Sequence, residues 1–530
     1  MSIAIILFYV FVTACMLLSY NPKPRKILEA IKGFLVHLGH TNEKPRTPRP
    51  DQVGRVWDIP GPKRLPLIGT KWTYMTGRYK LNKQHEAFAD LNRRYGKIVL
   101  EQDQVPVVHL FDREDMEKVL RFPSKYPFRP PTEIIAAYRQ SRPDRFASVG
   151  IVNLQGPQWH DHRVKLTSAI MSRKILQAFL PTMNQICDEF VELIRNKRDA
   201  NGDIRDFQDY TNTFALEFIC CFVLGRRMGF LANDNQINEK FLKLATAVKS
   251  NFVYISRSYY ELKLWKYFPT KLYRDYVRGE ETIYDIIAEI VSETLEQQEN
   301  LNCSDDDVRG IFFSILQTES LDKREKITGI IDLIHASIAT VSNTLCFLLY
   351  NLSHQPEMQR KIADEFPKSP EIITSNDLYS ASFTKACIKE SYRISPTTPC
   401  LARILEQEFV LSGYRLDAGV VVLCHTQIAC QSEDNFKQAH RFQPERWLEQ
   451  TDENQNVYKL EEPGASLVLP FGIGRRMCPG SKIVDIELTI VIAKILQHFE
   501  IEYRSDLDTQ FQFMLAPKTP IRISFKDRNN

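Results

Sequence analysis

The chain has 530 residues, of which 43% are hydrophobic and 11% aromatic, and its formal net charge is +4. So small a net charge over this length excludes a dedicated nucleic-acid-binding protein. No long linker, charge block or internal repeat divides the sequence after about residue 58, which predicts one large domain with a sizeable buried core.

The cysteines predict a reducing compartment. There are eleven of them, an odd number, and none forms a CxxC pair. Cys220 and Cys221 are adjacent, which suits neither a disulfide framework nor a zinc site. Most cysteines stand between apolar residues, so we expect them to be small buried hydrophobic side chains.

The N-terminus predicts a hydrophobic anchor or targeting segment at residues 1–20. Ile3–Tyr20 carries no charge and is long enough to enter a bilayer. A cleavable secretory signal is disfavoured, because no charged residue precedes the apolar run. Residues 21–56 are rich in Lys, Arg and Pro and read as a stiff basic linker. The globular domain is then expected at 57–530.

Within that domain the patterns predict a mainly α fold with small β-sheets. Trp57–Trp72 is rich in Pro and Gly and reads as a rigid extended segment. Lys97–Phe111 is β-branched and strand-like. Apolar residues at helical spacing predict helices at 158–196, 209–226, 238–253 and 274–298. Lys326–Leu352 is apolar on most sides and is expected to cross the middle of the molecule. Short strands are predicted within 409–416, 420–424 and 521–525.

A lone thiol, Cys478, stands in a glycine-rich stretch just before an apolar-periodic segment. Gly472, Gly474 and Gly480 allow tight turns whose backbone N–H groups point at the sulfur. Pro479 suits the first turn of a following helix. A helix N-terminus lowers the pKa of a thiol, so the loop is expected to hold an anionic sulfur, with arginines beside it that suit carboxylates.

Phe471–Cys478, FGIGRRMC, resembles the haem-binding loop of the cytochrome P450 family. The resemblance implies haem b (iron protoporphyrin IX) as the cofactor, with the Cys478 thiolate as axial ligand of the iron and Phe471 beside it. In KESYR, Glu390 and Arg393 match the helical ExxR pair of the family. Arg446 of FQPERW would complete its Glu–Arg–Arg cluster. Taken alone, each motif has an ordinary structural explanation, such as an ion pair on a helix face.

Four further residues are implied as haem contacts. Trp159 and Arg163 match the WxxxR motif, which in this family contacts a haem propionate. Arg403 and Arg476 would hold the propionates together with Arg163 as charge-assisted pairs. Arg403 rests on the weakest of these motifs.

The resemblance implies the cytochrome P450 fold, with a long central helix over the haem in a single large domain. Its details are similar to mitochondrial-type members of the family that hydroxylate steroids. Such a monooxygenase takes a steroid and dioxygen as substrates, and electrons from NADPH through ferredoxin reductase and ferredoxin. Two alternatives stay open: a haem-thiolate isomerase or dehydratase, and a non-catalytic haem protein that binds a steroid or a gas.

The central helix departs from the pattern of the family. The resemblance implies an acid followed by a threonine for proton delivery, and the chain has Ala339 followed by Thr340. Ser337 lies three residues before Thr340, so both hydroxyls would share one helix face and order water. Thr340 and Ser337 are therefore the candidate catalytic residues, with weaker coupling of oxygen use to product expected.

Lys385 and Lys389 lie one helical turn apart, beside Glu390. In mitochondrial-type relatives lysines at these positions face the acidic ferredoxin, which implies a redox-partner surface. The expected location is a mitochondrial membrane. The endoplasmic reticulum is the alternative, because an apolar run that precedes basic residues is typical of its anchors. A monomer without nucleic acid is expected.

Substrate contacts are expected from the resembled fold, because a sterol needs a long apolar slot with a few polar anchors. The candidate positions are Ile134–Arg139, Phe146, Ile331–Thr340, Thr397–Cys400 and Leu515–Pro517.

Overall fold

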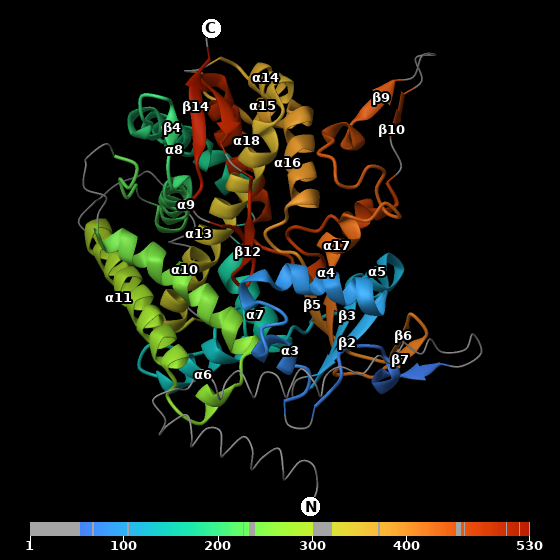
Figure 1. Ribbon diagram of the computed structural model, residues 1–530. Helices are drawn as coiled ribbons and strands as arrows, with labels where there is room; N and C mark the ends of the chain where they lie inside the picture. Colours follow the sequence, from blue (N-terminus) through green and yellow to red (C-terminus); the bar gives the residue numbers. More distant parts are fainter. Residues whose placement is uncertain are drawn as a thin grey trace, which may run out of the picture.

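A computed structural model describes residues 53–528, apart from positions 66–67, 103–104, 169, 171, 226, 233–238, 300–320, 369–370, 452–456, 460–461, 505 and 519. The predicted anchor at residues 1–20 lies outside the described residues, and so does nearly all of the predicted linker. Figure 1 shows helices on one side of the molecule and a sheet region on the other, as predicted for a mainly α fold.

The long helices form the larger part of the structure. They are α7 (Gly156–Thr167), α8 (Arg173–Lys197), α9 (Phe207–Leu224), α10 (Glu239–Tyr260), α11 (Lys271–Glu299) and α13 (Lys323–Ser353). The prediction of one helix over 158–196 is wrong, because the chain turns between Thr167 and Arg173. Ser168 and Ser172 flank this turn, and serine favours helix ends over helix interiors. The turn lets α7 contact the cysteine loop while α8 packs on α18.

Shorter helices flank these. They are α3 (Trp72–Met75), α4 (Gln84–Tyr95), α5 (Arg113–Leu120), α6 (Glu133–Ser141), α14 (Pro356–Asp364), α15 (Ser375–Ser380), α16 (Ser382–Ile394), α17 (Thr426–Cys430) and α18 (Ser481–His498). Single 3₁₀ turns are η1 (Val56–Asp58), η2 (Leu81–Lys83), η3 (Leu264–Lys266), η4 (Pro444–Trp447), η5 (Pro463–Leu467) and η6 (Gly474–Arg476).

The largest described sheet has four strands in the order β2 (Ile98–Gln102), β3 (Pro106–Leu110), β8 (Val421–Cys424) and β5 (Leu401–Ile404). Lys97–Phe111, predicted as one strand, forms the β2–β3 hairpin with Ile98 opposite Leu110. The smaller sheets join β1 (Gly54–Arg55), β7 (Tyr414–Leu416) and β6 (Phe409–Leu411); β11 (Phe499–Tyr503), β14 (Ile523–Asp527) and β4 (Asp203–Ile204); β12 (Thr509–Phe511) and β13 (Leu515–Pro517); and β9 (Glu449–Thr451) and β10 (Val457–Lys459).

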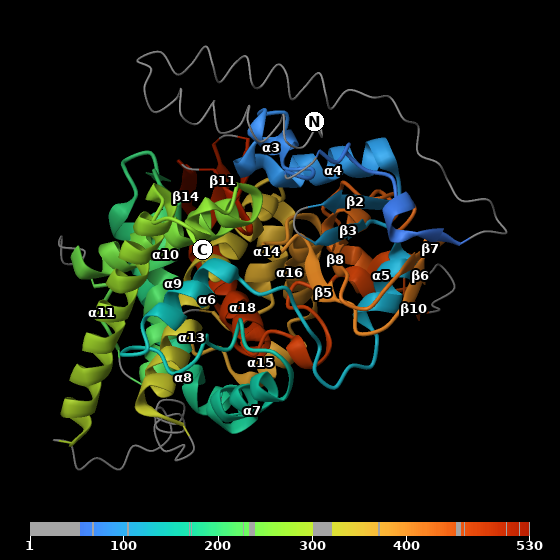
Figure 2. The ribbon, with the colours of Figure 1, turned by 90° about the horizontal axis from the view of Figure 1, so that it is seen from below.

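Helix α13 runs through the middle of the molecule, between the helical side and the sheet side (Figures 1 and 2). Its first turn carries a capping box, in which Asp322 accepts from the Arg324 N–H and Glu325 accepts from the Asp322 N–H. Beyond Ile327 most of its residues are buried, chiefly against α9. Within the described residues it is the one helix apolar and long enough to span a membrane, and burial in this core explains that composition.

Cysteines in this core behave as predicted. Seven of the nine described cysteines are buried, and all nine are free thiols. Cys478 is the exception that matters here, because it is exposed.

Gln359 of α14 ties three parts of the core together. Its side chain is fully buried, donates to the carbonyls of Leu352 and Ile501 at 2.9 and 3.0 Å, and accepts from the Ile501 N–H at 3.0 Å. These bonds connect α14, the end of α13 and β11.

We expect Gln359→Ala to lower the free energy of unfolding by about 2–4 kcal/mol, because it leaves buried backbone groups without partners. Glu357→Ala on the exposed side of the same helix is the control, expected within about 0.5 kcal/mol of the parent. Denaturant unfolding followed by circular dichroism measures both. Equal midpoints for the two variants would contradict this role of Gln359.

Candidate functional site

A cavity of ≈ 370 Å³ lies between α13, α9 and the cysteine loop. Seven predicted site residues line it: Trp159, Arg163, Ser337, Thr340, Phe471, Arg476 and Cys478. Arg403 faces a neighbouring pocket that it shares with Arg475. Of the predicted substrate ranges, residues within 331–340 and 397–400 line the cavity, and those at 134–139, 146 and 515–517 do not.

The cysteine loop is shaped by backbone turns. Gly472 and Gly474 both have φ of +74°, a region that side-chain-bearing residues rarely adopt. The Cys478 N–H donates to the Phe471 carbonyl at 2.8 Å, which closes the loop just before α18 begins at Ser481. The Cys478 side chain is exposed to the space of the cavity, although the surrounding protein keeps bulk water away from its sulfur. The loop therefore presents one sulfur to an enclosed space.

The prediction that this loop by itself lowers the pKa of the thiol is wrong. Burial raises the pKa of Cys478, and this outweighs the opposing effects of the Gly480 N–H, Arg163 and Arg129. A bound metal cation deprotonates a coordinating thiol through its own charge. A haem iron at this position would therefore offset the effect of burial on the thiol.

Four arginines gather beside the cysteine loop. Arg163 donates to the Met477 carbonyl, and Arg403 donates to the Ile473 carbonyl at 3.3 Å. Arg476 is buried, lies 3.8 Å from the centre of the Trp159 ring, and donates to the carbonyls of Pro127 and Leu154. The fourth, Arg129, donates to the Arg476 carbonyl at 2.7 Å.

None of these arginines has a carboxylate partner among the described residues. Burial and the mutual repulsion of the cluster lower the pKa of Arg129 to about 10 and that of Arg476 to about 9. An anionic ligand would stabilise these unpaired guanidinium groups by charge-assisted hydrogen bonds. A haem carries two propionates on one edge, so the arginines and the thiol fit the expected haem, with the propionates among the arginines and the iron at Cys478.

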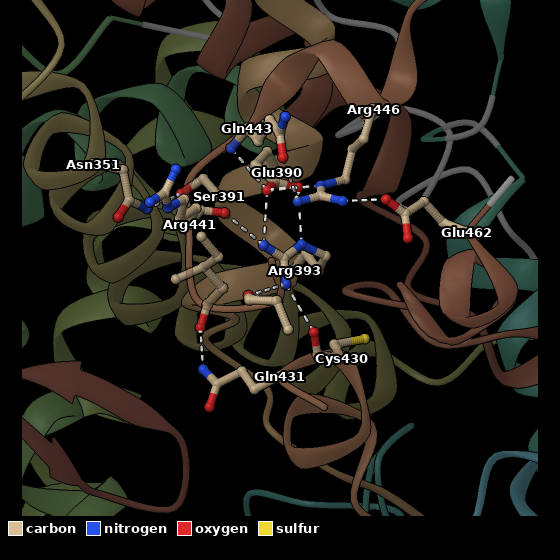
Figure 3. Close-up of polar contacts among 12 residues, drawn as sticks. Asn351, Glu390, Ser391, Arg393, Cys430, Gln431, Arg441, Gln443, Arg446 and Glu462 are labelled. Atoms are coloured by element: carbon tan, nitrogen blue, oxygen red, sulfur yellow. Dashed lines mark hydrogen bonds and ion pairs between the residues drawn. The ribbon is translucent and has the colours of Figure 1, made fainter. Parts of the chain in front are cut away.

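The residues of the predicted Glu–Arg–Arg cluster do not line the cavity; Glu390 and Arg393 stand on α16, and Arg446 points toward Glu390 (Figure 3). Glu390 is fully buried and accepts two hydrogen bonds from Arg393, at 2.7 and 2.9 Å, and one from Arg446 at 3.1 Å. The Gln443 N–H and the Trp447 indole N–H also donate to this carboxylate. Every polar atom of the Glu390 carboxylate is therefore satisfied without water.

Arg393 uses its remaining donors to hold the chain that leads to the cysteine loop. It donates to the carbonyls of Cys430, Ala439 and Arg441 at 2.6–2.9 Å. Arg446 also pairs with Glu462, which directly precedes η5. The cluster thus holds residues 430–441 against α16 and ties Glu462 to Arg446.

On α13 the two predicted catalytic hydroxyls lie in the cavity wall. Ser337 donates to the Leu333 carbonyl at 2.8 Å and Thr340 to the Ala336 carbonyl at 2.8 Å. Each oxygen keeps lone pairs that can accept from water. Ala339 faces a different, small cavity, which it shares with Lys249 and Gln208.

Lys385 and Lys389 are exposed on α16, as a partner surface requires. The Lys385 ammonium donates to the Tyr379 carbonyl at 3.1 Å, and the Lys389 ammonium lies 4.0 Å from the centre of the Trp447 ring. Both cations are thus oriented on the side of α16 that adjoins residues 379 and 447.

Sequence reasoning missed two residues of this site, Arg129 and Glu462. Arg129 stands in PFRPP, where the flanking prolines were the available signal for a fixed, extended arginine. Glu462 stands in an acidic stretch that carries no motif. Its role arises only because Arg446 folds against it.

Comparisons with known proteins agree with this geometry. The family model described as Cytochrome P450 matches residues 59–525. The chain is 50% identical over 495 residues to an ecdysone 20-monooxygenase of Drosophila melanogaster, covering 92% of this chain and 91% of the relative. It is 28% identical over 484 residues to the mitochondrial 1,25-dihydroxyvitamin D(3) 24-hydroxylase of Rattus norvegicus, with 90% of each chain covered. A probable mitochondrial cytochrome P450 12a5 of Drosophila melanogaster is 29% identical over 479 residues, covering 86% of this chain and 88% of the relative.

We expect Arg129→Ala to bind haem about 10- to 100-fold more weakly, because one charge-assisted hydrogen bond to a propionate is lost. The rate of haem transfer to excess apomyoglobin measures this. Arg475→Ala removes an exposed arginine of the cysteine loop that does not line the cavity, so it is the matched control and should release haem at the parent rate. Equal transfer rates for both variants would remove Arg129 from the site.

Proposed function

This chain belongs to the cytochrome P450 family, and from that premise we propose that it hydroxylates the steroid ecdysone at C20 to give 20-hydroxyecdysone. The observation that carries the proposal is the 50% identity to an ecdysone 20-monooxygenase along 92% of the chain. The cysteine loop, the arginine cluster and the cavity all lie within the matched region. Residues 57–530 form the haem-thiolate monooxygenase domain in this proposal.

The residues of the cavity would hold the haem in a defined way. Cys478 would bind the iron, and Arg129, Arg163 and Arg476 would hold the propionates, with Arg403 behind them. When bound, the haem activates dioxygen, so that one oxygen atom enters a C–H bond and the other leaves as water.

The chain itself supplies position, protons and a dry cavity. Apolar side chains from α9, among them Phe218, Ile219 and Phe222, cover one wall and exclude water. On α13, the Ser337 and Thr340 hydroxyls would orient water molecules that carry protons into the cavity.

Electrons would come from NADPH through ferredoxin reductase and a ferredoxin that docks on Lys385 and Lys389. The mitochondrial relatives support this choice of partner and a mitochondrial location. Residues 1–20 would anchor a monomer to the membrane, with residues 21–56 as the linker.

The function is tested by incubating haem-loaded protein with ecdysone, ferredoxin, its reductase and NADPH, and by quantifying 20-hydroxyecdysone and hydrogen peroxide together. Product that depends on ferredoxin is the expected result. Hydrogen peroxide without product would reject ecdysone as the substrate. Neither signal, from protein with an intact thiolate-ligated haem spectrum, would favour an isomerase, a dehydratase or a binding protein.

We expect Ala339→Glu to lower the hydrogen peroxide released per product several-fold, because it restores the acid that precedes the threonine in the resembled family. Ala339→Gln has nearly the same shape without the acid and should leave the ratio unchanged. A ratio that falls equally in both variants would show an effect of packing alone.

Reversing both charges with Lys385→Glu and Lys389→Glu should lower kcat/KM for ferredoxin by about 10-fold or more at low salt and abolish most of its salt dependence. The control reverses Lys243 and Lys271, which are exposed on α10 and α11 and give the same net charge. If the control pair has the same effect, docking does not use the α16 surface.

A further inference from the structure

A buried ion pair lies in the wall of the cavity, where the proposed chemistry does not use it. Arg139 of α6 donates to Asp332 of α13 at 2.5 Å, and both side chains are only 6% exposed. The Ile151 N–H donates to the other oxygen of the carboxylate at 3.1 Å. Asp332 also lines the cavity that holds Cys478, Ser337 and Thr340.

The backbone makes room for this pair. Gly150 has φ of +81°, and a Cβ at that position would lie 1.9 Å from the Arg139 Nη1 and 2.5 Å from the Asp332 Oδ2. The Arg139 guanidinium also lies 5.2 Å from the centre of the Phe146 ring. A loop, two helices and an aromatic ring thus hold the carboxylate in one place.

Stability does not explain such a pair. An apolar replacement of similar volume is often as stable as a buried ion pair, because removing two charges from water is costly. The pair also leaves hydrogen-bonding capacity unused. A carboxylate offers about four acceptor positions, of which two are filled by Arg139 and Ile151. Among the described residues, the Arg139 Nε has no hydrogen-bond partner.

Further buried polar groups gather behind the pair. On α11, Glu280 is 5% exposed and accepts from Asn251 of α10 at 2.9 Å. His335 stands one turn after Asp332 on α13, and its Nε2 has no partner within the described part of the chain. These groups do not line the cavity, and Asp332 is the member of this buried polar cluster that reaches it.

The position of Asp332 matches the size of a steroid. It lies eight residues before Thr340, which is about 12 Å along the helix axis, close to the length of a four-ring steroid nucleus. If the side chain of the steroid reacts beside Thr340, its A ring reaches Asp332. In ecdysone that ring carries two hydroxyl groups.

We propose that Asp332, held by Arg139, accepts a hydrogen bond from an A-ring hydroxyl of the steroid and so selects polyhydroxylated steroids. This inference rests on the proposed function. It adds to that function the residue that recognises the A-ring end of the substrate. A carboxylate only accepts hydrogen bonds, so it favours a hydroxyl and disfavours a ketone at the same position. The selection therefore depends on whether the steroid carries a hydrogen-bond donor at this position, and not on the shape of its ring.

The test measures the dissociation constants of ecdysone, its 3-keto analogue and its 2-deoxy analogue from the absorbance shift they cause in haem-loaded protein. We expect at least one analogue to bind about 10- to 100-fold more weakly than ecdysone, the strength of one hydrogen bond to a charged group. Equal binding of all three by the unaltered protein would overturn the proposal, whatever any variant does.

Asp332→Asn keeps the size of the side chain and adds an N–H donor that a ketone can accept. It should reduce the preference for ecdysone over the 3-keto analogue by about 10-fold or more. Gly150→Ala displaces the pair without changing a charge and should also reduce the preference. Asp285→Asn removes an exposed carboxylate that does not line the cavity and should preserve the preference. If Asp332→Asn weakens all three steroids equally, the pair only clamps α6 to α13 and the proposal fails.

Turnover measured in parallel separates this proposal from the proposed function. A hydroxyl preference in binding without 20-hydroxyecdysone would support the role of Asp332 and reject the reaction. Product without any hydroxyl preference would support the reaction and overturn the role of Asp332.

Discussion

A buried charge has to be paired, and the architecture around the cysteine loop depends on one such pairing. The Glu390 carboxylate is fully buried between Arg393 and Arg446 and receives five hydrogen bonds. Removing one partner of a buried pair leaves an uncompensated charge, which costs about 3–5 kcal/mol. Because Arg393 also holds three carbonyls between Cys430 and Arg441, the same carboxylate fixes a long irregular stretch that no sheet or helix stabilises. The Asn435 carbonyl in that stretch accepts from the Gly464 N–H at 3.0 Å, so the constraint reaches η5, which precedes the cysteine loop in the chain.

The cavity shows the opposite arrangement. Here the chain gathers Arg129, Arg163 and Arg476 with Arg403 nearby and provides no carboxylate for them among the described residues. The same apolar surroundings raise the pKa of Cys478. A ligand that carries a metal cation at its centre and two carboxylates at its edge would offset both features. The site is thus organised electrostatically for a haem before any substrate arrives.

Helix α13 separates the tasks of the active site. Asp332, Ser337 and Thr340 of this helix all line the cavity. Ala339 belongs to another face, which opens on a small cavity with Lys249 and Gln208. The proposed proton supply by Ser337 and Thr340 and the proposed substrate recognition by Asp332 would therefore use different positions of a single helix. The length of the helix sets the spacing between them.

The sequence by itself determined the elements and motifs whose chemistry needs a fixed local spacing. The helical periodicity of 326–352, the ExxR pair of Glu390 and Arg393, and the glycines around Cys478 all act within one or two turns of chain, and local geometry is what a pattern records. The helical periodicity of 158–196 did not predict its division into two helices, because that division depends on α7 and α8 packing against different neighbours. Only the tertiary structure decided the roles of Arg129, Glu462 and Asp332, since each meets its partner across 16 to 347 residues of chain. Such pairings depend on which distant segments the folded backbone brings together, and a local sequence pattern does not encode this.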